Sequence, residues 1–216
     1  MRAALPKQYL TLSGRPVIAH TLDRLCTHAR VRGVMVGVAA DDEHWRRAAI
    51  TLPKLLGTFT GGATRAHTVL NGLAALAAHA RMDDWVMVHD AVRPCLRQDD
   101  IDRLITVAMS NTDGGLLALP VSDTVKRVDS ADKVVETVSR TNLWRALTPQ
   151  MFRFDRLQVA LQQALVRGAE VTDEASAIEA AGGRPVLVAG HADNIKITMP
   201  ADLPLAELFL HQQGGA

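Results

Sequence analysis

Val86-Met87-Val88-His89-Asp90-Ala91-Val92-Arg93-Pro94 is an apolar run that ends abruptly in an acid, a base and a proline. The run, which begins at Trp85, is typical of a buried strand. In open α/β sheets ligands bind beyond the carboxyl ends of the strands, so Asp90 and Arg93 are candidates for contact with a charged substrate and its metal ion. On local grounds alone, a turn capped by Asp90 with a solvated Arg93 is an equal alternative.

Helical and strand patterns alternate outward from this stretch. Apolar residues recur at three-to-four spacing over 16–29, 65–80 and 99–109. Short apolar runs cover 33–39, 85–89 and 114–120. This alternation predicts an α/β fold with a doubly wound, mostly parallel sheet. Further patterns follow: helices over 155–167, 173–181 and 203–210, and strands over 185–188 and 195–198.

The rhythm breaks after Pro120, where polar and β-branched residues alternate over 124–128 and 133–138. Between these segments lies the turn-like Asp129-Ser130-Ala131-Asp132, so we predict a β-hairpin arm at about 121–142. An isolated hairpin is marginal in water. The arm is therefore expected to pack on something else, most simply a second subunit.

Bulk properties limit the class of protein. The chain has 216 residues and a net charge of +1, which fits one domain over 1–216 and provides no overall field for nucleic acid or an anionic membrane. Any phosphate binding must then come from local clusters. Cys26 and Cys95 form no disulfide framework or metal spacing, and no apolar run is long enough to span a bilayer. We expect a cytoplasmic protein without a membrane or nucleic-acid partner.

Four further groups of charged or small residues fall at the ends of the predicted elements. They are Pro6-Lys7-Gln8-Tyr9, Gly61-Gly62-Ala63-Thr64-Arg65 with Thr68, Thr172-Asp173-Glu174-Ala175-Ser176, and Asp193-Asn194-Ile195-Lys196-Ile197-Thr198. The two glycines permit close backbone approach, and the helix after them offers free N–H groups to an anion. Each group also has a simpler explanation: a solvated lysine, a strand-to-helix turn, or an N-cap with acids in the first turn.

Taken together, these groups resemble the 2-C-methyl-D-erythritol 4-phosphate cytidylyltransferase family. The matching words run in family order from residue 6 to residue 198. They comprise the groups above, residues 89–94, Pro120-Val121-Ser122-Asp123-Thr124-Val125-Lys126 and Leu147-Thr148-Pro149-Gln150. The resemblance implies a Rossmann-like nucleotidyltransferase domain that dimerises through the projecting hairpin. It also implies transfer of CMP from CTP to 2-C-methyl-D-erythritol 4-phosphate in the non-mevalonate isoprenoid pathway.

The resemblance also implies roles for residues at the nucleotide. Lys7 would stabilise the charge that builds on the α-phosphate of CTP. Gly62 and Thr68 would lie near the cytosine, Arg65 would also bind CTP, and Asp90 would lie near the ribose and Mg²⁺.

A second set of residues is implied for the acceptor. Arg140 and Lys196, counted with Lys7 as catalytic, would hold the phosphate of methylerythritol phosphate for attack. Four other residues would help them: Arg93, Thr124, Thr148 and Thr172. Because Thr124 and Arg140 flank or lie on the hairpin, some of these contacts are expected to cross the dimer interface.

The implied reaction accounts for these residue types. A phosphate oxygen must attack the α-phosphorus of a tetra-anionic triphosphate, so cations have to offset the repulsion before pyrophosphate leaves. A general base is unnecessary, because the acceptor phosphate is already ionised at neutral pH. Lysine, arginine, threonine and one acid are therefore expected in place of a nucleophilic Ser, Cys or His.

One family element is not found in the printed sequence. The family begins with an apolar strand and a glycine-rich loop, Ala-Ala-Gly-x-Gly-x-Arg-Met, and by spacing Met1 falls on its last residue. We expect that an internal methionine was taken as the start of an intact enzyme. The alternatives are a truncated, poorly active or inactive dimeric module, and a cytidylyltransferase for another alditol phosphate such as ribitol 5-phosphate.

Overall fold

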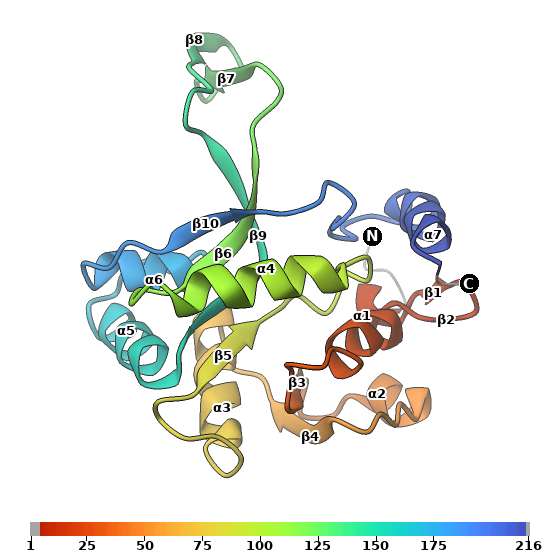
Figure 1. The fold of residues 1–216 in the computed structure, drawn as a ribbon. Helices are drawn as coiled ribbons and strands as arrows, with labels where there is room; N and C mark the ends of the chain where they lie inside the picture. The colour runs from red at the N-terminus through yellow and green to blue at the C-terminus, as the bar shows by residue number, and fades with distance from the viewer. Residues whose placement is uncertain (1–4, 215–216) are drawn as a thin grey trace.

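The computed structural model describes residues 5–214, and Met1, the expected end of the glycine-rich loop, lies outside them. Over these residues, helices alternate with strands except at β1–β2, at the run β6–β9 and at α5–α6 (Figure 1). The helices are η1 (Lys7–Tyr9), α1 (Val17–Cys26), α2 (Glu43–Ala48), α3 (Arg65–Leu76), α4 (Gln98–Met109), α5 (Phe154–Val166), α6 (Glu174–Ala180) and α7 (Asp202–Gln212). The strands are β1 (Thr11–Leu12), β2 (Arg15–Pro16), β3 (Val34–Val38), β4 (Leu55–Thr60), β5 (Trp85–Val88), β6 (Gly115–Pro120), β7 (Val125–Val128), β8 (Val134–Val138), β9 (Trp144–Arg153) and β10 (Val186–Ala189).

The main sheet has the strand order β10-β6-β9-β5. Strands β10 and β6 are parallel, and β9 runs antiparallel to both of its neighbours, β6 and β5. The other two strands of the α/β layer, β3 and β4, form a separate parallel pair. Only β9 therefore runs against the prevailing direction of the main sheet.

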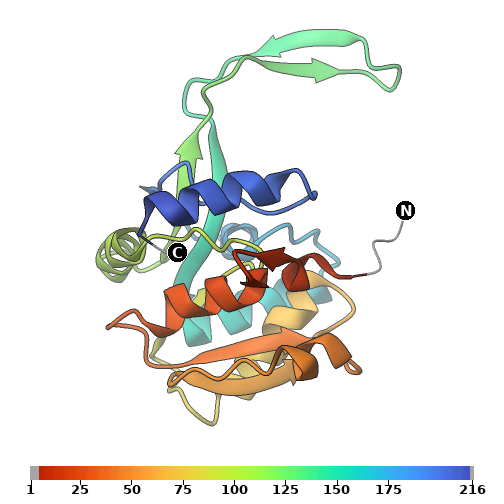
Figure 2. The ribbon, with the colours of Figure 1, turned by 90° about the vertical axis from the view of Figure 1, so that its right-hand side faces the viewer.

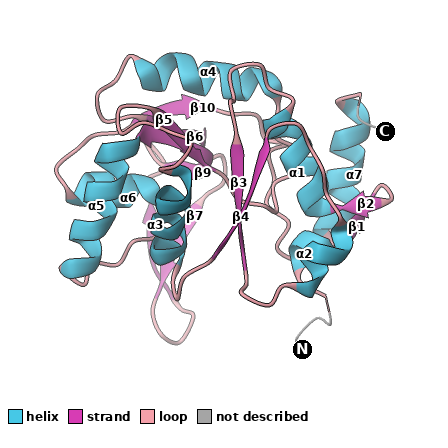
Figure 3. Cartoon of the chain, turned by 90° about the horizontal axis from the view of Figure 1, so that it is seen from below, coloured by secondary structure: helices cyan, strands magenta, loops and turns pink. Residues whose placement is uncertain are grey.

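Helices cover both faces of the main sheet (Figure 3). One core cluster joins α3, α5 and α6 to the sheet through residues such as Leu73, Leu161 and Phe152. A second joins α4 to the opposite face through Leu104 and Leu117. Each large apolar side chain buried in this way contributes about 1.5–3 kcal/mol to the burial free energy. These two cores fix β5, and hence the position of the residues that follow it.

Local capping explains where the helices near the predicted site begin. At α3, Thr64 Oγ1 accepts a hydrogen bond from the backbone N–H of His67. At α6, Asp173 and Ser176 form a reciprocal capping box, with Asp173 Oδ1 2.9 Å from the Ser176 nitrogen. At α3 this cap satisfies one of the free N–H groups of the first turn, and the box at α6 holds the start of that helix.

An apolar slot separates β3 from β5. Just before β3 and β5 begin, Arg32 Nη2 lies 2.6 Å from Asp84 Oδ1. At the other end, Arg65 follows β4 and Asp90 follows β5, and Arg65 Nη2 lies 3.8 Å from Asp90 Oδ1. Because β3 is parallel to β4, these contacts show that β3 and β5 run in the same direction. Within residues 5–214, β3 pairs only with β4 and β5 only with β9. The cavity between them has a volume of about 800 Å³ and lies between α1 and α3.

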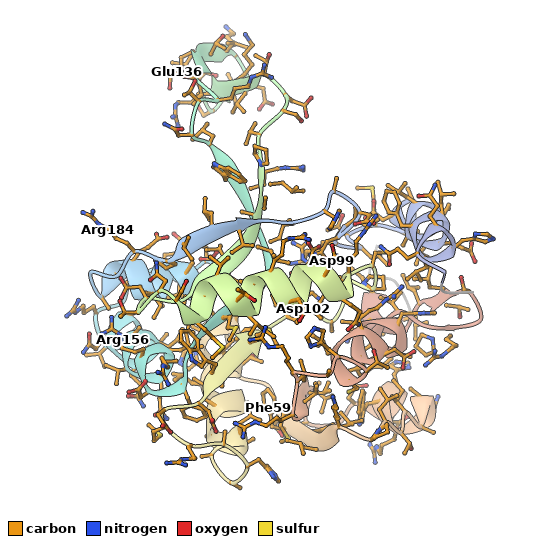
Figure 4. All side chains as sticks on the ribbon, viewed as in Figure 1. Phe59, Asp99, Asp102, Glu136, Arg156 and Arg184 are labelled. Atoms are coloured by element: carbon orange, nitrogen blue, oxygen red, sulfur yellow. The ribbon has the colours of Figure 1, made fainter. Side chains whose placement is uncertain are left out.

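The predicted hairpin is confirmed. Strands β7 and β8 pair antiparallel, with Val125 opposite Val138, and the arm projects away from the body of the molecule (Figure 2). Glu136 Oε1 accepts a hydrogen bond from Arg127 Nε across the arm, and Figure 4 places Glu136 far from the sheet. The arm leaves Val134 and Val135 exposed within the single chain.

Four segments, residues 195–198, β9, α2 and β4, differ from the predictions. Residues 195–198 form an extended loop. Ile195 N–H donates locally to the Asp193 carbonyl, and the described backbone hydrogen bond to a distant segment, from Ile197 N–H to the Val92 carbonyl, does not make a ladder. Strand β9 was not predicted, since Pro149 lies inside it and proline disfavours the interior of a strand. Helix α2 and strand β4 were also missed. Among the described helices, none combines the length and apolar character required to cross a membrane.

Candidate active site

Asp90 follows β5 and lies among three cationic side chains. Asp90 Oδ2 is 3.1 Å from Lys196 Nζ and 3.2 Å from Arg93 Nε, and Oδ1 is 3.8 Å from Arg65 Nη2. Burial alone would raise the pKa of Asp90, but Lys196, followed by Arg93 and Arg65, outweighs burial and lowers it. The structure thus brings four predicted site residues, from three separate parts of the chain, to one edge of the sheet.

Arg65 has a second carboxylate partner on α6. Its guanidinium donates to both oxygens of Glu174, and the bond from Nη2 to Oε2 measures 2.9 Å. The Glu174 side chain is only 1% exposed, whereas that of Arg65 is 35% exposed. Burial raises the pKa of Glu174, although Arg65 opposes the shift. Arg65 is therefore held by a buried acid on α6, while part of its own side chain remains exposed to solvent.

Lys196 is positioned by the turn that precedes it. Arg97 forms an ion pair with Asp193, and Arg93 Nη1 donates to the Asn194 carbonyl at 2.8 Å. Asn194 Nδ2 in turn donates to the Thr148 carbonyl at 2.9 Å. These contacts hold the loop over β9 in the absence of a β-ladder.

His89 joins Thr148 to the Asp90–Arg93 turn. Because the Arg93 carbonyl can only accept, His89 Nε2 donates to it at 3.3 Å, and His89 Nδ1 accepts from the Thr148 hydroxyl at 3.0 Å. Thr148 Oγ1 also accepts from the Asp90 N–H at 3.0 Å. Burial lowers the pKa of His89 to about 4, so the ring is neutral at pH 7. The hydroxyl that was predicted to help hold the acceptor is thus hydrogen-bonded within the protein.

The glycine turn lies against the start of α3. A Cβ at Gly62 would lie 2.4 Å from His67 Cβ and 2.8 Å from the His67 carbonyl carbon. The Gly62 N–H donates to Thr68 Oγ1 at 2.9 Å, and this hydroxyl also donates to the Thr64 carbonyl. Gly62 therefore packs closely against the first turn of α3 and lies beside Thr68.

The remaining predicted residues lie outside the cluster around Asp90. Lys7 is exposed on η1, which is anchored by the hydrogen bond from the Tyr9 hydroxyl to Asp42 at 2.7 Å. Arg140 donates to the Ser122 carbonyl at the base of the arm, and Thr124 and Thr172 are exposed. Across residues 5–214, Lys7 and Arg140 take part in no ion pair with Asp90.

Sequence reasoning missed Glu174 and His89 as parts of the site. Glu174 stands in the first turn of a helix, where an acid is already explained by capping and the helix dipole. His89 lies at the end of an apolar run, and its hydrogen-bond partner nearby in sequence is the Arg93 carbonyl of the following turn. Only their tertiary partners, Arg65 and Thr148, distinguish them.

Asp90 is the residue best suited to a hard cation. Its Oδ1 faces Arg65 only at 3.8 Å, and one carboxylate beside substrate phosphates is a usual way of holding Mg²⁺. Asp99, Asp100 and His191 form another close group, but Arg103 already pairs with both acids. Figure 4 shows Asp99 on α4, which packs on the sheet face opposite α3.

Comparisons with known proteins agree with this architecture. A family model described as 2-C-methyl-D-erythritol 4-phosphate cytidylyltransferase matches residues 1–212. Relatives with that name include a Hahella chejuensis protein, 49% identical over 96% of this chain and 86% of its own length. An Azoarcus sp. protein is 50% identical over 100% of this chain and 90% of its own length.

Solved structures are similar over nearly the whole chain. A crystal structure of 4-diphosphocytidyl-2C-methyl-D-erythritol synthase has a TM-score of 0.86 and 39% identity, and covers 95% of both chains. The Francisella tularensis 2-C-methyl-D-erythritol 4-phosphate cytidylyltransferase has a TM-score of 0.85 and 35% identity, covering 95% of this chain and 94% of its own. The chain therefore belongs to the 2-C-methyl-D-erythritol 4-phosphate cytidylyltransferase family of enzymes and has their Rossmann-like nucleotidyltransferase fold.

Proposed function

We propose that the protein transfers CMP from CTP to 2-C-methyl-D-erythritol 4-phosphate, releasing pyrophosphate and 4-diphosphocytidyl-2-C-methyl-D-erythritol. The observation that carries the proposal is the cluster of Arg65, Arg93 and Lys196 around Asp90 beyond the carboxyl end of β5. In α/β sheets this edge is where ligands bind. Three cations around one acid give a net positive site that suits two anionic substrates.

The reaction is a displacement at phosphorus. An oxygen of the acceptor phosphate forms a bond to the α-phosphorus of CTP while the bond to the pyrophosphate oxygen breaks. We assign Lys196 and Arg93, with Arg140, Thr124, Thr148 and Thr172, to hold the acceptor phosphate. Fixed cations stabilise the charge that develops in the transition state, and a single such donor contributes about 2.7–4 kcal/mol.

The nucleotide side of the site is assigned to Gly62, Arg65, Thr68 and Asp90, with Lys7 at the α-phosphate. Asp90 would hold Mg²⁺ through Oδ1 together with oxygens of the triphosphate. When bound, the cation neutralises charge on the triphosphate and favours departure of pyrophosphate. Free N–H groups at the start of α3 are available to an anion.

We further propose that the protein is a cytoplasmic homodimer, with residues 1–216 as one domain and the arm at about 121–142 as the dimer contact. The exposed Val134 and Val135 on β8 support this role, because an isolated two-stranded ribbon gains stability by packing. Arg140 at the base of the arm would then approach the partner's site. This arrangement gives Arg140 a function that its contacts within one chain do not.

The test measures pyrophosphate release with CTP, 2-C-methyl-D-erythritol 4-phosphate and Mg²⁺. Release should require all three, and Lys196→Met should lower the rate by about a hundredfold or more because it removes one charged donor. Arg184→Met is the matched control, since Arg184 is exposed before β10 (Figure 4) and takes part in none of the described ion pairs of Asp90. Ribitol 5-phosphate should be a poor acceptor. Folded protein that releases no pyrophosphate would favour a catalytically inactive module.

A further inference from the structure

Glu174 is a buried acid with its ionic contact directed at the candidate site. Its side chain is 1% exposed, and both of its oxygens accept hydrogen bonds from Arg65. A buried charge is costly unless it is paired, so loss of Arg65 would leave Glu174 as an unpaired buried acid. Neither the family resemblance nor the proposed mechanism gives Glu174 a task.

The backbone that carries Glu174 is held rigidly. Gln150 on β9 donates from Nε2 to Asp173 Oδ2 at 2.8 Å and accepts at Oε1 from the Ala175 N–H, also at 2.8 Å. Gln150 is itself 1% exposed, and the capping box of Asp173 and Ser176 completes the turn. The start of α6, which carries Glu174, is thus hydrogen-bonded to the main sheet through Gln150.

Arg65 stands between two carboxylates. It contacts Glu174 directly, whereas its Nη2 stays 3.8 Å from Asp90 Oδ1. Asp90 Oδ2 already has Lys196 and Arg93 within 3.2 Å. Without the pull of Glu174, Arg65 would be drawn to the remaining Asp90 oxygen, because opposite charges attract more strongly at a partly buried site than in water.

We propose that Glu174 is a positioning residue that holds Arg65 away from Asp90, so that Asp90 Oδ1 remains available to the metal-bound nucleotide. The inference rests on the proposed function, since it assigns Asp90 to the nucleotide and its cation. It predicts an effect on CTP and Mg²⁺ and none on the acceptor, whose phosphate is assigned to Lys196 and Arg93.

The test compares Glu174→Gln with wild type. The variant keeps the shape of the side chain and removes its charge, so the KM for CTP should rise about tenfold at limiting Mg²⁺, the scale of one charge-assisted hydrogen bond. The KM for the acceptor should stay within about twofold, and high Mg²⁺ should restore much of the CTP affinity, because Mg²⁺ then competes better with Arg65. Glu179→Gln is the control, since Glu179 is exposed on the same helix.

A double-variant cycle separates positioning from folding. In an Arg65→Lys background, Glu174→Gln should change the KM for CTP by less than it does alone, because both act through one contact. Equal rises in both KM values, insensitivity to Mg²⁺, or full additivity with Arg65→Lys would each overturn the inference. Calorimetric titration of each protein with CTP in the presence of Mg²⁺ compares the CTP affinities without turnover. An inactive wild type that still shows this difference in CTP binding would refute the proposed function and leave the positioning role standing.

Discussion

Gly62→Ala and Gly61→Ala provide a sharp test of the turn before α3, because the two glycines are adjacent and meet different surroundings. A Cβ at Gly62 would lie 2.4 Å from His67 Cβ and 2.8 Å from a His67 backbone atom, so the start of α3 would have to move. At Gly61 the nearest atom to a Cβ is Thr68 Oγ1 at 3.4 Å, which is ordinary contact. Only the first substitution should therefore distort the turn.

The magnitude follows from three contributions. Overpacking costs about 1–3 kcal/mol, and loss of the 2.9 Å hydrogen bond from Gly62 N–H to Thr68 Oγ1 costs about 1 kcal/mol more. Replacing glycine by alanine also restricts the unfolded chain, which favours folding by about 0.4–1 kcal/mol in both variants. Gly62→Ala should therefore lower the free energy of unfolding by about 1–3 kcal/mol, whereas Gly61→Ala should leave it unchanged or slightly higher.

The assay is urea unfolding followed by tryptophan fluorescence, with a thermal melt in parallel. For a chain of this size, each kcal/mol corresponds to about 2–4 °C in Tm. Because Gly62 is assigned to the nucleotide, Gly62→Ala should also raise the KM for CTP. If Gly62→Ala proves as stable as Gly61→Ala, the close approach between the turn and α3 does not exist in solution and the reasoning is refuted.

Three other predictions can be checked on the same protein. Lys7→Ala should lower kcat by about a hundred- to a thousandfold, because Lys7 is assigned to stabilise the transition state. The Tm should not change, because Lys7 is exposed. Unaltered turnover in the assay of pyrophosphate release would contradict the assigned role. Burial lowers the pKa of His89 to about 4 from 6.5, so the unfolded state binds the proton more readily and the native state should lose about 2 kcal/mol between pH 7 and pH 5. Urea unfolding should show that loss in wild type and a flatter pH dependence in His89→Asn; equal slopes would contradict it. The apolar slot between β3 and β5 should bind the dye ANS at neutral pH while the near-UV circular dichroism remains native, and an unchanged dye emission would mean that the slot is closed in solution.

Much of the site could be predicted because the edge of an α/β sheet is encoded locally. An apolar run that ends in Asp90 identifies both the strand and the end at which polar residues collect, and β5 ends at Val88 as this pattern requires. Topology then brings Arg65, Arg93 and Lys196 to that edge, since each follows or lies beside an element that ends there. The pattern of elements alone left each of these groups with a simpler explanation, and the family resemblance assigned Arg65 and Lys196 to the same site as Asp90.

Other features could not be predicted because their causes are distant in sequence. Strand β9 contains Pro149, and its ladder with β5 and β6 outweighs the local cost of proline. Residues 195–198 have the composition of a strand, yet they meet a loop at Val92, so a ladder cannot form. The sequence pattern of a segment indicates its propensity to form a strand, whereas strand pairing depends on which other segment the fold brings beside it.

By itself, the sequence determined the class of fold, the hairpin arm and the family, because hydrophobic periodicity, turn residues and ordered motifs are properties of neighbouring positions. The tertiary structure alone decided that Glu174 holds Arg65, that His89 is a neutral link to Thr148, and that an apolar slot lies between β3 and β5. Such features depend on burial and on partners brought together by folding: the Arg65–Glu174 pair spans 109 positions, and the His89–Thr148 pair spans 59. Burial determines the protonation of these groups, and burial cannot be inferred from neighbouring positions in the sequence.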